Sequence, residues 1–231
     1  MGRKKVEMDS KGRVIGLFSN NPEYFRMLNS LKNEWMHFFK RYEMVLKELE
    51  SDFAILDLEW NANHGYSPIE HIKTRLKKPI SLIKKIERKK VPFNQEEINT
   101  QIKDIAGIRI VTSFIDDVYM LLEHIKSRDD LIVTEVRDYI KIPKPSGYQS
   151  LHVIVEAQVI LSNSVIWVPA EIQLRTLSMD FWASLEHKLQ YKYKKNGEIP
   201  EGDRELLREV AKSSFENDLK MSMLRQKLLD T

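Results

Sequence analysis

The chain contains no cysteine among its 231 residues, which excludes disulfides, thiolate metal sites and cysteine nucleophiles. No apolar run approaches the roughly 20 residues that span a bilayer, and no apolar stretch follows the basic residues at 3–5, so no secretory signal is visible. The six histidines are scattered without a close His-x-x-x-His pair, which argues against a structural zinc site. We therefore expect a cytoplasmic globular protein that does not bind membranes.

An excess of one charge sign is also missing, because 37 Lys and Arg stand against 34 Asp and Glu, a net charge of +3. The segment 73–90 is nevertheless locally basic. A basic patch on a nearly balanced protein favours a discrete phosphate site over indiscriminate coating of nucleic acid. A solvated basic helix face is the alternative. The basic residues of this segment are Lys73, Arg75, Lys77, Lys78, Lys84, Lys85, Arg88, Lys89 and Lys90.

Hydrophobic periodicity predicts helices, then a mixed sheet, then helices, which is an α+β or mixed α/β fold with a central sheet of about five strands. We expect a flexible N-terminus at 1–20, one domain at 21–200 and a C-terminal helix at 201–231 that serves oligomerisation. The expected helices lie at about 22–57, from 79, at 95–103, 115–127, 176–194 and 203–229. The expected strands lie at 108–112, 131–142, 150–160 and 165–175, and 61–68 is expected to be a loop.

The first helix carries one apolar stripe at alternating three- and four-residue steps. Core packing or an oligomer seam explains such a stripe better than a cofactor does. Its residues are Leu28, Leu31, Trp35, Phe38, Tyr42, Val45 and Leu49.

The segment 165–176 reads as a strand whose two faces differ, because side chains alternate along a strand. Its even positions from 166 to 174 are apolar or small, whereas Glu171, Gln173 and Arg175 are polar. Arg109 lies opposite two isoleucines in the same way, and His152 alternates with apolar neighbours. In the strand expected at 131–142, we assign Ile132, Val136, Ile140 and Ile142 to one face and Glu135, Arg137, Tyr139 and Lys141 to the other. These patterns predict a sheet with an apolar face and a charged face suited to polyanionic ligands.

The segment 144–152 reads as a loop that enters a strand, since Pro143, Pro145 and Gly147 interrupt regular structure. Tyr148 is placed to stack on a planar base. Lys144 and His152 flank it as phosphate donors. The alternative is a hairpin-like connection with an incidental tyrosine.

Three motifs together resemble the synthetase domain of the RelA/SpoT homologues over about residues 65–195. They are Asp104-Ile-Ala-Gly-Ile-Arg109, then Asp138-Tyr-Ile-Lys141 leading into Lys144-Pro-Ser-Gly-Tyr148-Gln-Ser-Leu-His152, then Glu171-Ile-Gln-Leu-Arg175-Thr176. The short chain and flanking helices resemble the small alarmone synthetases of that family. The resemblance implies the nucleotidyltransferase-like fold of these enzymes, which transfer pyrophosphate from ATP to the ribose 3′-hydroxyl of GDP or GTP.

The resemblance also implies a role for each site residue. Asp104 and Glu171 match the carboxylates that bind Mg²⁺, the expected cofactor, and Glu171 matches the candidate general base. Arg75 and Arg109 match the arginines that sandwich adenine, and Lys77, Lys85 and Arg88 match groups that grip the ATP phosphates. On the acceptor side, Tyr148 matches the guanine-stacking tyrosine. The other GDP- or GTP-binding positions are Arg137, Lys144, His152, Gln173 and Arg175.

The resemblance further implies a homotetramer that needs no ribosome or nucleic acid. The bifunctional members' hydrolase contains a His-Asp pair; this chain has no His-Asp dipeptide, so we expect synthesis without hydrolysis. Two alternatives stay open: a toxin of the same fold that pyrophosphorylates the 3′ end of tRNA, and a non-catalytic nucleic-acid-binding protein. The modest net charge disfavours the first, and the second leaves Asp104, Glu171 and Tyr148 without a purpose.

Overall fold

The computed structural model describes residues 7–8, 14–16, 22–193 and 200–229. By its internal contacts the chain divides into Met1–Lys40 and Arg41–Thr231. In the first unit, β1 (Glu7–Met8) and β2 (Val14–Gly16) form a short antiparallel pair. The rest of the N-terminus that we expect to be flexible lies outside the described residues.

The second unit is built on one mixed sheet of five strands, as predicted. The strand order is β3-β4-β7-β6-β5, in which β4 and β7 are parallel and the other neighbours antiparallel. The sequence reading missed β3, because this strand lies at a sheet edge and much of it is exposed and charged. The strands are β3 (Ile69–Leu76), β4 (Ala106–Thr112), β5 (Leu131–Asp138), β6 (Leu151–Ile160) and β7 (Val165–Thr176).

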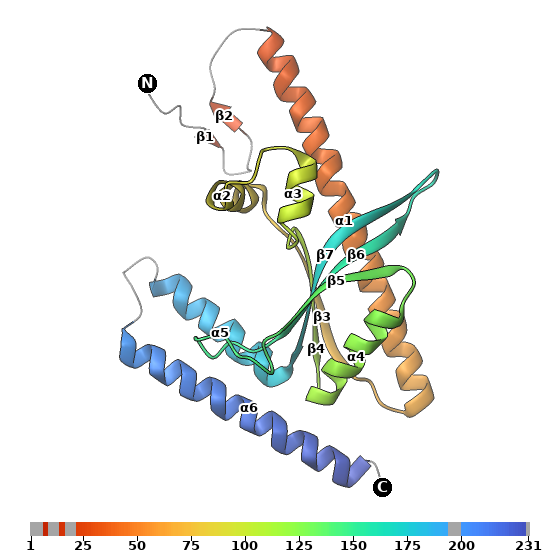
Figure 1. The fold of residues 1–231 in the computed structure, drawn as a ribbon, viewed down its shortest axis with the longest axis vertical. Coiled ribbons are helices and arrows are strands. Elements are labelled where there is room, and N and C mark those ends of the chain that lie inside the picture. The colour runs from red at the N-terminus through yellow and green to blue at the C-terminus, as the bar shows by residue number, and fades with distance from the viewer. Residues whose placement is uncertain (1–6, 9–13, 17–21, 194–199, 230–231) are drawn as a thin grey trace. The chain divides into compact units, whose positions relative to one another are not determined.

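Helices lie on both sides of this sheet. Figure 1 shows α4 on one side and α5 on the other, and both contact β4 and β7. The final helix packs along α5, where the indole Nε1 of Trp182 donates a hydrogen bond to the Leu207 carbonyl at 2.8 Å. The helices are α1 (Pro22–His64), α2 (Pro79–Lys89), α3 (Gln95–Gln101), α4 (Ile115–Ser127), α5 (Leu177–Tyr193) and α6 (Glu201–Leu229).

The apolar stripe predicted for α1 is buried where the structure describes it beyond residue 40. Tyr42, Val45 and Leu49 are almost fully buried. The structure does not describe the side chains of Leu28 and Leu31. The helix continues past the predicted end near residue 57. It stops at Gly65, whose N–H donates to the Asn61 carbonyl at 2.8 Å. The φ of Gly65 is +64°, the left-handed conformation with which glycine commonly ends a helix.

The prediction of a strand through residue 142 is wrong. Asp138 ends β5, because its Oδ1 accepts hydrogen bonds from the backbone N–H groups of Ile140 at 3.0 Å and Lys141 at 2.9 Å, a local turn that competes with strand pairing. The register with β6 also shifts between Val133 and Glu135. The apolar face assigned to this segment is mostly exposed, since β5 lies at the sheet edge; Ile132 is 51% and Ile142 77% exposed.

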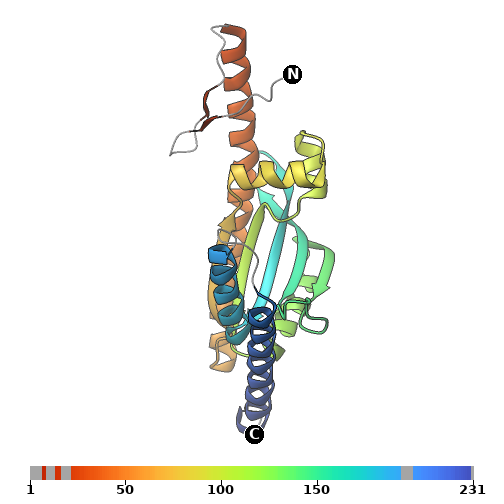
Figure 2. The same ribbon diagram turned by 90° about the vertical axis from the view of Figure 1, so that its left-hand side faces the viewer.

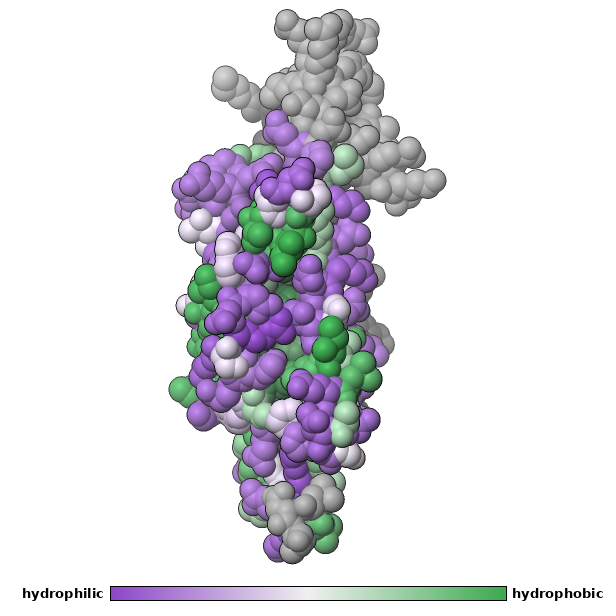
Figure 3. All heavy atoms as spheres, turned by 90° about the vertical axis from the view of Figure 1, so that its right-hand side faces the viewer, coloured by the Kyte–Doolittle hydropathy of each residue, from purple (hydrophilic) through white to green (hydrophobic). Residues whose placement is uncertain are grey.

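The surface mixes apolar and hydrophilic side chains. Figure 3 shows separate apolar patches among hydrophilic residues on the right-hand side of Figure 1. Among the described residues, no helix is long and apolar enough to cross a membrane.

Tyr42→Phe is expected to destabilise the second unit by about 1 kcal/mol, the usual net contribution of one hydrogen bond. Tyr42 is 1% exposed and its hydroxyl donates to Asn99 Oδ1, which links α1 to α3. Urea unfolding of Tyr42→Phe, Asn99→Ala and the double variant measures this contribution. If the two single losses simply add in the double variant, the hydrogen bond contributes nothing.

Candidate functional site

The polar face of the sheet carries one residue from each strand in a single row. The register pairs Lys73 with Arg109, Arg109 with Gln173, Gln173 with His152 and His152 with Arg137. Four of these five are predicted site residues, and strand pairing brings them onto one face. Figure 2 looks onto the sheet between α2 and α5.

Asp104 lies just before β4 and forms ion pairs with two lysines. Its Oδ2 is 3.0 Å from Lys77 Nζ and 2.7 Å from Lys85 Nζ. Burial alone would raise the pKa of Asp104, but hydrogen bonds from Lys85 and Lys77 outweigh burial and hold this pKa below its ordinary value. Its Oδ1 is buried without a hydrogen-bond partner among the described residues. Asp104 is thus an ionised carboxylate with one oxygen available to a ligand.

Glu171 lies in β7 and uses both carboxylate oxygens. Its Oε1 is 2.9 Å from Nδ1 of His152, and its Oε2 accepts a hydrogen bond from Gln173 Nε2 at 2.9 Å. Burial would raise the pKa of Glu171, but the hydrogen bond and charge of His152 and the Gln173 amide lower it below the ordinary value. The charge of Asp104 acts in the opposite direction and raises this pKa.

The predicted acceptor residues continue from Glu171 as a chain of hydrogen bonds. His152 Nε2 is 2.7 Å from the hydroxyl of Tyr148, and Arg175 Nη2 donates to the same hydroxyl at 2.6 Å. Arg175 also donates to Gln173 Oε1 at 3.2 Å. The structure therefore brings Glu171, His152, Tyr148 and Arg175 together, although they come from a loop and two strands.

Asp180 is a site residue that the sequence reading missed. It lies in the first turn of α5, is 7% exposed, and its Oδ1 accepts hydrogen bonds from Arg109 at 2.9 Å and Arg175 at 3.1 Å. Burial lowers the pKa of Arg109, and the neighbouring charge of Arg175 lowers it further. An acidic residue in the first turn of a helix is ordinary, so nothing in the sequence indicated this contact.

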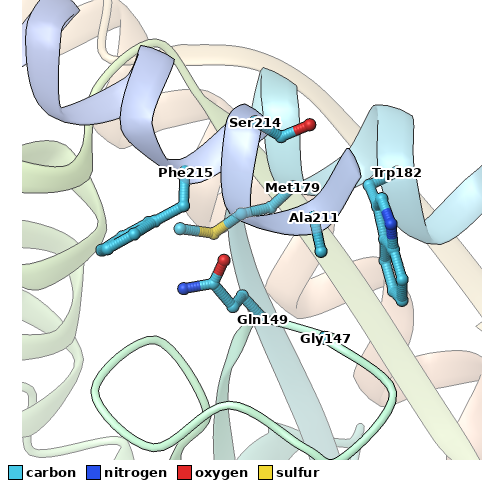
Figure 4. A pocket seen from close by; sticks show the side chains of 7 residues that line it. All are labelled: Gly147, Gln149, Met179, Trp182, Ala211, Ser214 and Phe215. Carbon is cyan, nitrogen blue, oxygen red and sulfur yellow. The ribbon is translucent and has the colours of Figure 1, made fainter. Parts of the chain in front are cut away.

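The loop with Tyr148 is a turn held against α5 and α6. Gly147 N–H donates to the Lys144 carbonyl at 2.8 Å, and Pro145 occupies the second position that β-turns favour. Behind the loop, a small cavity has room for about one water molecule. Figure 4 shows its lining residues: Gly147, Gln149, Met179, Trp182, Ala211, Ser214 and Phe215.

Lys144 and Tyr139 lie beside the predicted acceptor residues. The ammonium group of Lys144 lies 4.7 Å from the ring centre of Tyr148 and 4.4 Å from that of Tyr139, which the sequence reading had not assigned to the site. Burial lowers the pKa of Lys144, and the charges of Arg137 and Arg175 add to this effect. The aromatic rings and cations together form a surface suited to a base and its phosphates.

Among the described residues, no side-chain hydrogen bond joins three further predicted residues, Arg75, Arg88 and Arg137, to the site residues above. Arg75 on β3 and Arg88 on α2 are exposed. Arg137 is also exposed, and both its Nε and Nη2 donate to the carboxylate of Glu135 at 2.6 Å. These three positions are accessible to a ligand.

The described residues contain no group of three or more histidines and carboxylates that could hold a metal by itself. Magnesium, however, is commonly held by one or two carboxylates together with substrate phosphates. The unpartnered Oδ1 of Asp104 and the nearby charge of Glu171 fit such a site. The residues present therefore fit a metal that shares its ligands with a nucleotide.

Comparison with known proteins gives matches over most of the chain. Residues 74–196 match the family model described as a region found in RelA / SpoT proteins. The GTP pyrophosphokinase YwaC of Bacillus subtilis (strain 168) is 41% identical over 201 residues, which are 87% of this chain and 95% of that protein.

Two solved structures share the fold. Small alarmone synthetase 1 from Bacillus subtilis bound to its product pppGpp has a TM-score of 0.76 and 35% identity, over 84% of this chain and 98% of that one. The same enzyme bound to AMPCPP has a TM-score of 0.72 and 32% identity, over 86% of this chain and all of that one.

Proposed function

This chain belongs to the RelA/SpoT family, and from that premise we propose that it is a GTP pyrophosphokinase, a small alarmone synthetase. It transfers the β,γ-pyrophosphate of ATP to the ribose 3′-hydroxyl of GDP or GTP, forms ppGpp or pppGpp and releases AMP, without hydrolysing the product. One observation carries the proposal: the Asp104 carboxylate pairs with two lysines, Lys77 and Lys85, while the Glu171 carboxylate belongs to a hydrogen-bonded network with His152, Tyr148 and Arg175.

We assign the ATP side to the residues around Asp104. Lys77 and Lys85 converge on its carboxylate, so their ammonium groups lie where they can hold the ATP phosphates. Arg109 and the exposed Arg75 supply planar guanidinium groups that suit stacking on adenine. Arg88 extends the basic surface along α2. These groups offset the repulsion between two anionic substrates.

The acceptor side is assigned to the loop and strands around Glu171. Tyr148 offers a ring for guanine, while Arg137, Lys144, His152 and Arg175 surround it with donors for phosphates, and Gln173 orients the Glu171 carboxylate. Glu171 accepts the proton of the 3′-hydroxyl while the hydroxyl oxygen forms a bond to the β-phosphorus of ATP. The bond between that phosphorus and the oxygen of AMP breaks, and AMP leaves. Because a carboxylate with a lowered pKa is a weak base, proximity contributes more to this step than basicity does.

We assign Asp104 and Glu171 as the protein ligands of Mg²⁺. When bound, the ion would neutralise phosphate charge and make the β-phosphorus more electrophilic. In the structure the two lysines neutralise the same Asp104 carboxylate. Free metal must therefore compete with them, whereas ATP phosphates would draw the lysines away.

Lys85→Gln is expected to change two affinities in opposite directions. Loss of one cation beside Asp104 should tighten binding of free Mn²⁺, a paramagnetic substitute for Mg²⁺, by about tenfold. Loss of a phosphate donor should weaken binding of ATP with Mg²⁺ by about tenfold. Electron paramagnetic resonance measures the first and calorimetry the second. The exposed neighbour Lys84→Gln serves as control, and weaker binding of both ligands to Lys85→Gln would contradict the assignment.

We also propose a cytoplasmic homotetramer that needs no ribosome. Its support is a row of half-exposed apolar side chains at every fourth position of α5, which suits burial between subunits: Leu177, Phe181, Leu185 and Leu189. Light scattering coupled to size-exclusion chromatography measures the mass in solution.

A nucleotide-transfer assay tests the function. Purified protein, Mg²⁺ and labelled ATP are mixed separately with GDP, GTP or bulk tRNA, and the products are separated by anion exchange. New guanosine tetra- or pentaphosphate together with AMP is the expected result and defines the preferred acceptor. Label transferred only to tRNA would identify the tRNA-modifying alternative. No AMP with any acceptor, from folded protein, would overturn the enzymatic function.

A further inference from the structure

Asp180 is a buried carboxylate that joins two arginines from neighbouring strands. Arg109 comes from β4 and Arg175 from β7, which are parallel, and both donate to the same oxygen, Oδ1. The other oxygen, Oδ2, lies 3.8 Å from Nε2 of His71 on β3. One carboxylate on α5 thus gathers cationic or protonatable groups from three consecutive strands of the sheet.

The two arginines belong to opposite halves of the site. Arg109 lies on the ATP side, whereas Arg175 donates to the Tyr148 hydroxyl, which in turn contacts His152 and, through it, Glu171. Without the carboxylate, two guanidinium groups would repel each other in a place with little solvent, since the Arg175 side chain is only 5% exposed. Asp180 therefore offsets this repulsion and links the two groups through one carboxylate oxygen.

Resting on the proposed function, we propose that Asp180 is a positioning residue that couples the two nucleotide sites. Through Arg109 and Arg175, binding of one substrate orders the guanidinium that the other substrate needs. Asp180 itself contacts neither substrate in this role. A mutual effect of two ligands on each other's affinity is the thermodynamic signature of such coupling.

Asp218 offers a matched control for a purely structural role. It is likewise a buried carboxylate on a helix, 6% exposed, and it accepts a hydrogen bond at 2.6 Å from Thr176, the residue that follows Arg175. This hydrogen bond anchors α6 to the end of β7, and among the described residues no hydrogen bond or ion pair joins Asp218 to either arginine. Asp218→Asn should lower the melting temperature and leave the Michaelis constants unchanged.

Asp180→Asn keeps the size of the side chain but removes the charge between the arginines. We expect the KM values for ATP and for the acceptor to rise together by about tenfold, with a fall in kcat. In wild type, GDP should tighten binding of the unreactive analogue AMPCPP by about fivefold, and in Asp180→Asn this effect should vanish. Calorimetry with and without GDP measures the coupling independently of turnover.

The results for wild type and for Asp180→Asn separate failure of this inference from failure of the proposed function. If wild type transfers pyrophosphate but Asp180→Asn changes neither KM nor the coupling, Asp180 is structural and the inference fails. A rise in only one KM would assign Asp180 to one nucleotide and also overturn the link. If Asp180→Asn does not fold, Asp180→Glu, which keeps the charge but displaces it by one methylene, must show the loss of coupling. Wild type that transfers nothing would instead overturn the proposed function.

Discussion

Glu171→Gln is expected to lower kcat by about 10³-fold or more. General acid–base catalysis alone typically contributes about 10²–10⁴-fold. The carboxylate supplies the proton acceptor and an anionic metal ligand, whereas a neutral amide cannot accept the proton and binds Mg²⁺ more weakly. The effect does not require the pKa of Glu171 to lie near the pH of the assay. His152 and Gln173 hold this pKa below its ordinary value despite burial, so the carboxylate is ionised at neutral pH. Initial rates at saturating ATP and acceptor measure the loss.

Glu156→Gln is the matched control for this substitution. Glu156 lies on the neighbouring strand β6 and pairs with Lys103 at 3.0 Å, and the register places it beside Pro169 of β7 rather than in the row of site residues. Its replacement should leave kcat near the wild-type value. If Glu171→Gln kept more than about a tenth of the wild-type kcat, Glu171 would not be the catalytic carboxylate. RNA binding that both variants retain equally would favour the non-catalytic alternative.

Gly147→Ala is expected to displace the loop that carries Tyr148 from α6. Gly147 has a φ of +89°. An added Cβ would lie 2.7 Å from Cβ of Ala211, which is closer than two non-bonded carbon atoms normally approach. Backbone strain and steric overlap together should lower the free energy of unfolding by about 2–4 kcal/mol. Because Tyr148 is the next residue, the KM for GDP or GTP should rise by about tenfold while the KM for ATP changes little.

Gly65→Ala separates strain from overlap. Its φ is +64°, but an added Cβ would meet no atom within 4 Å, so only the strain of about 1–2 kcal/mol remains. Ala211→Gly in the Gly147→Ala background removes the overlapping atom and should restore the acceptor KM. Thermal unfolding and initial rates measure both effects. Equal behaviour of the two glycine variants would show that contact with α6 does not position the loop.

Local pattern predicts most elements of the fold. The four predicted strands and the helices from 79, 95, 115, 176 and 203 are present, although several ends differ by a few residues. The exceptions have local causes. Strand β3 is an exposed and charged edge, β5 ends early because Asp138 bonds to the backbone of the next turn, and α1 continues until Gly65. Edge strands carry a weak periodicity signal because they bury little surface.

The sequence predicted individual site residues but not the contacts that join them. Matching motifs brought Asp104, Glu171 and Tyr148 into one set, yet no spacing indicated that Lys77 and Lys85 would both bind Asp104. No sequence pattern indicated Asp180, because its partner Arg109 lies 71 positions away in the chain. Contacts of this kind depend on how the elements pack.

The sequence by itself therefore determined most of the helices and strands, which side chains of β7 alternate onto the polar face, and which family the motifs resemble. These properties follow from local periodicity and residue chemistry. Only the tertiary structure decided the strand order, the register that aligns Lys73, Arg109, Gln173, His152 and Arg137 across the sheet, and the junction at Asp180. Burial of the apolar face sets that order and register, and it acts between residues far apart in the chain.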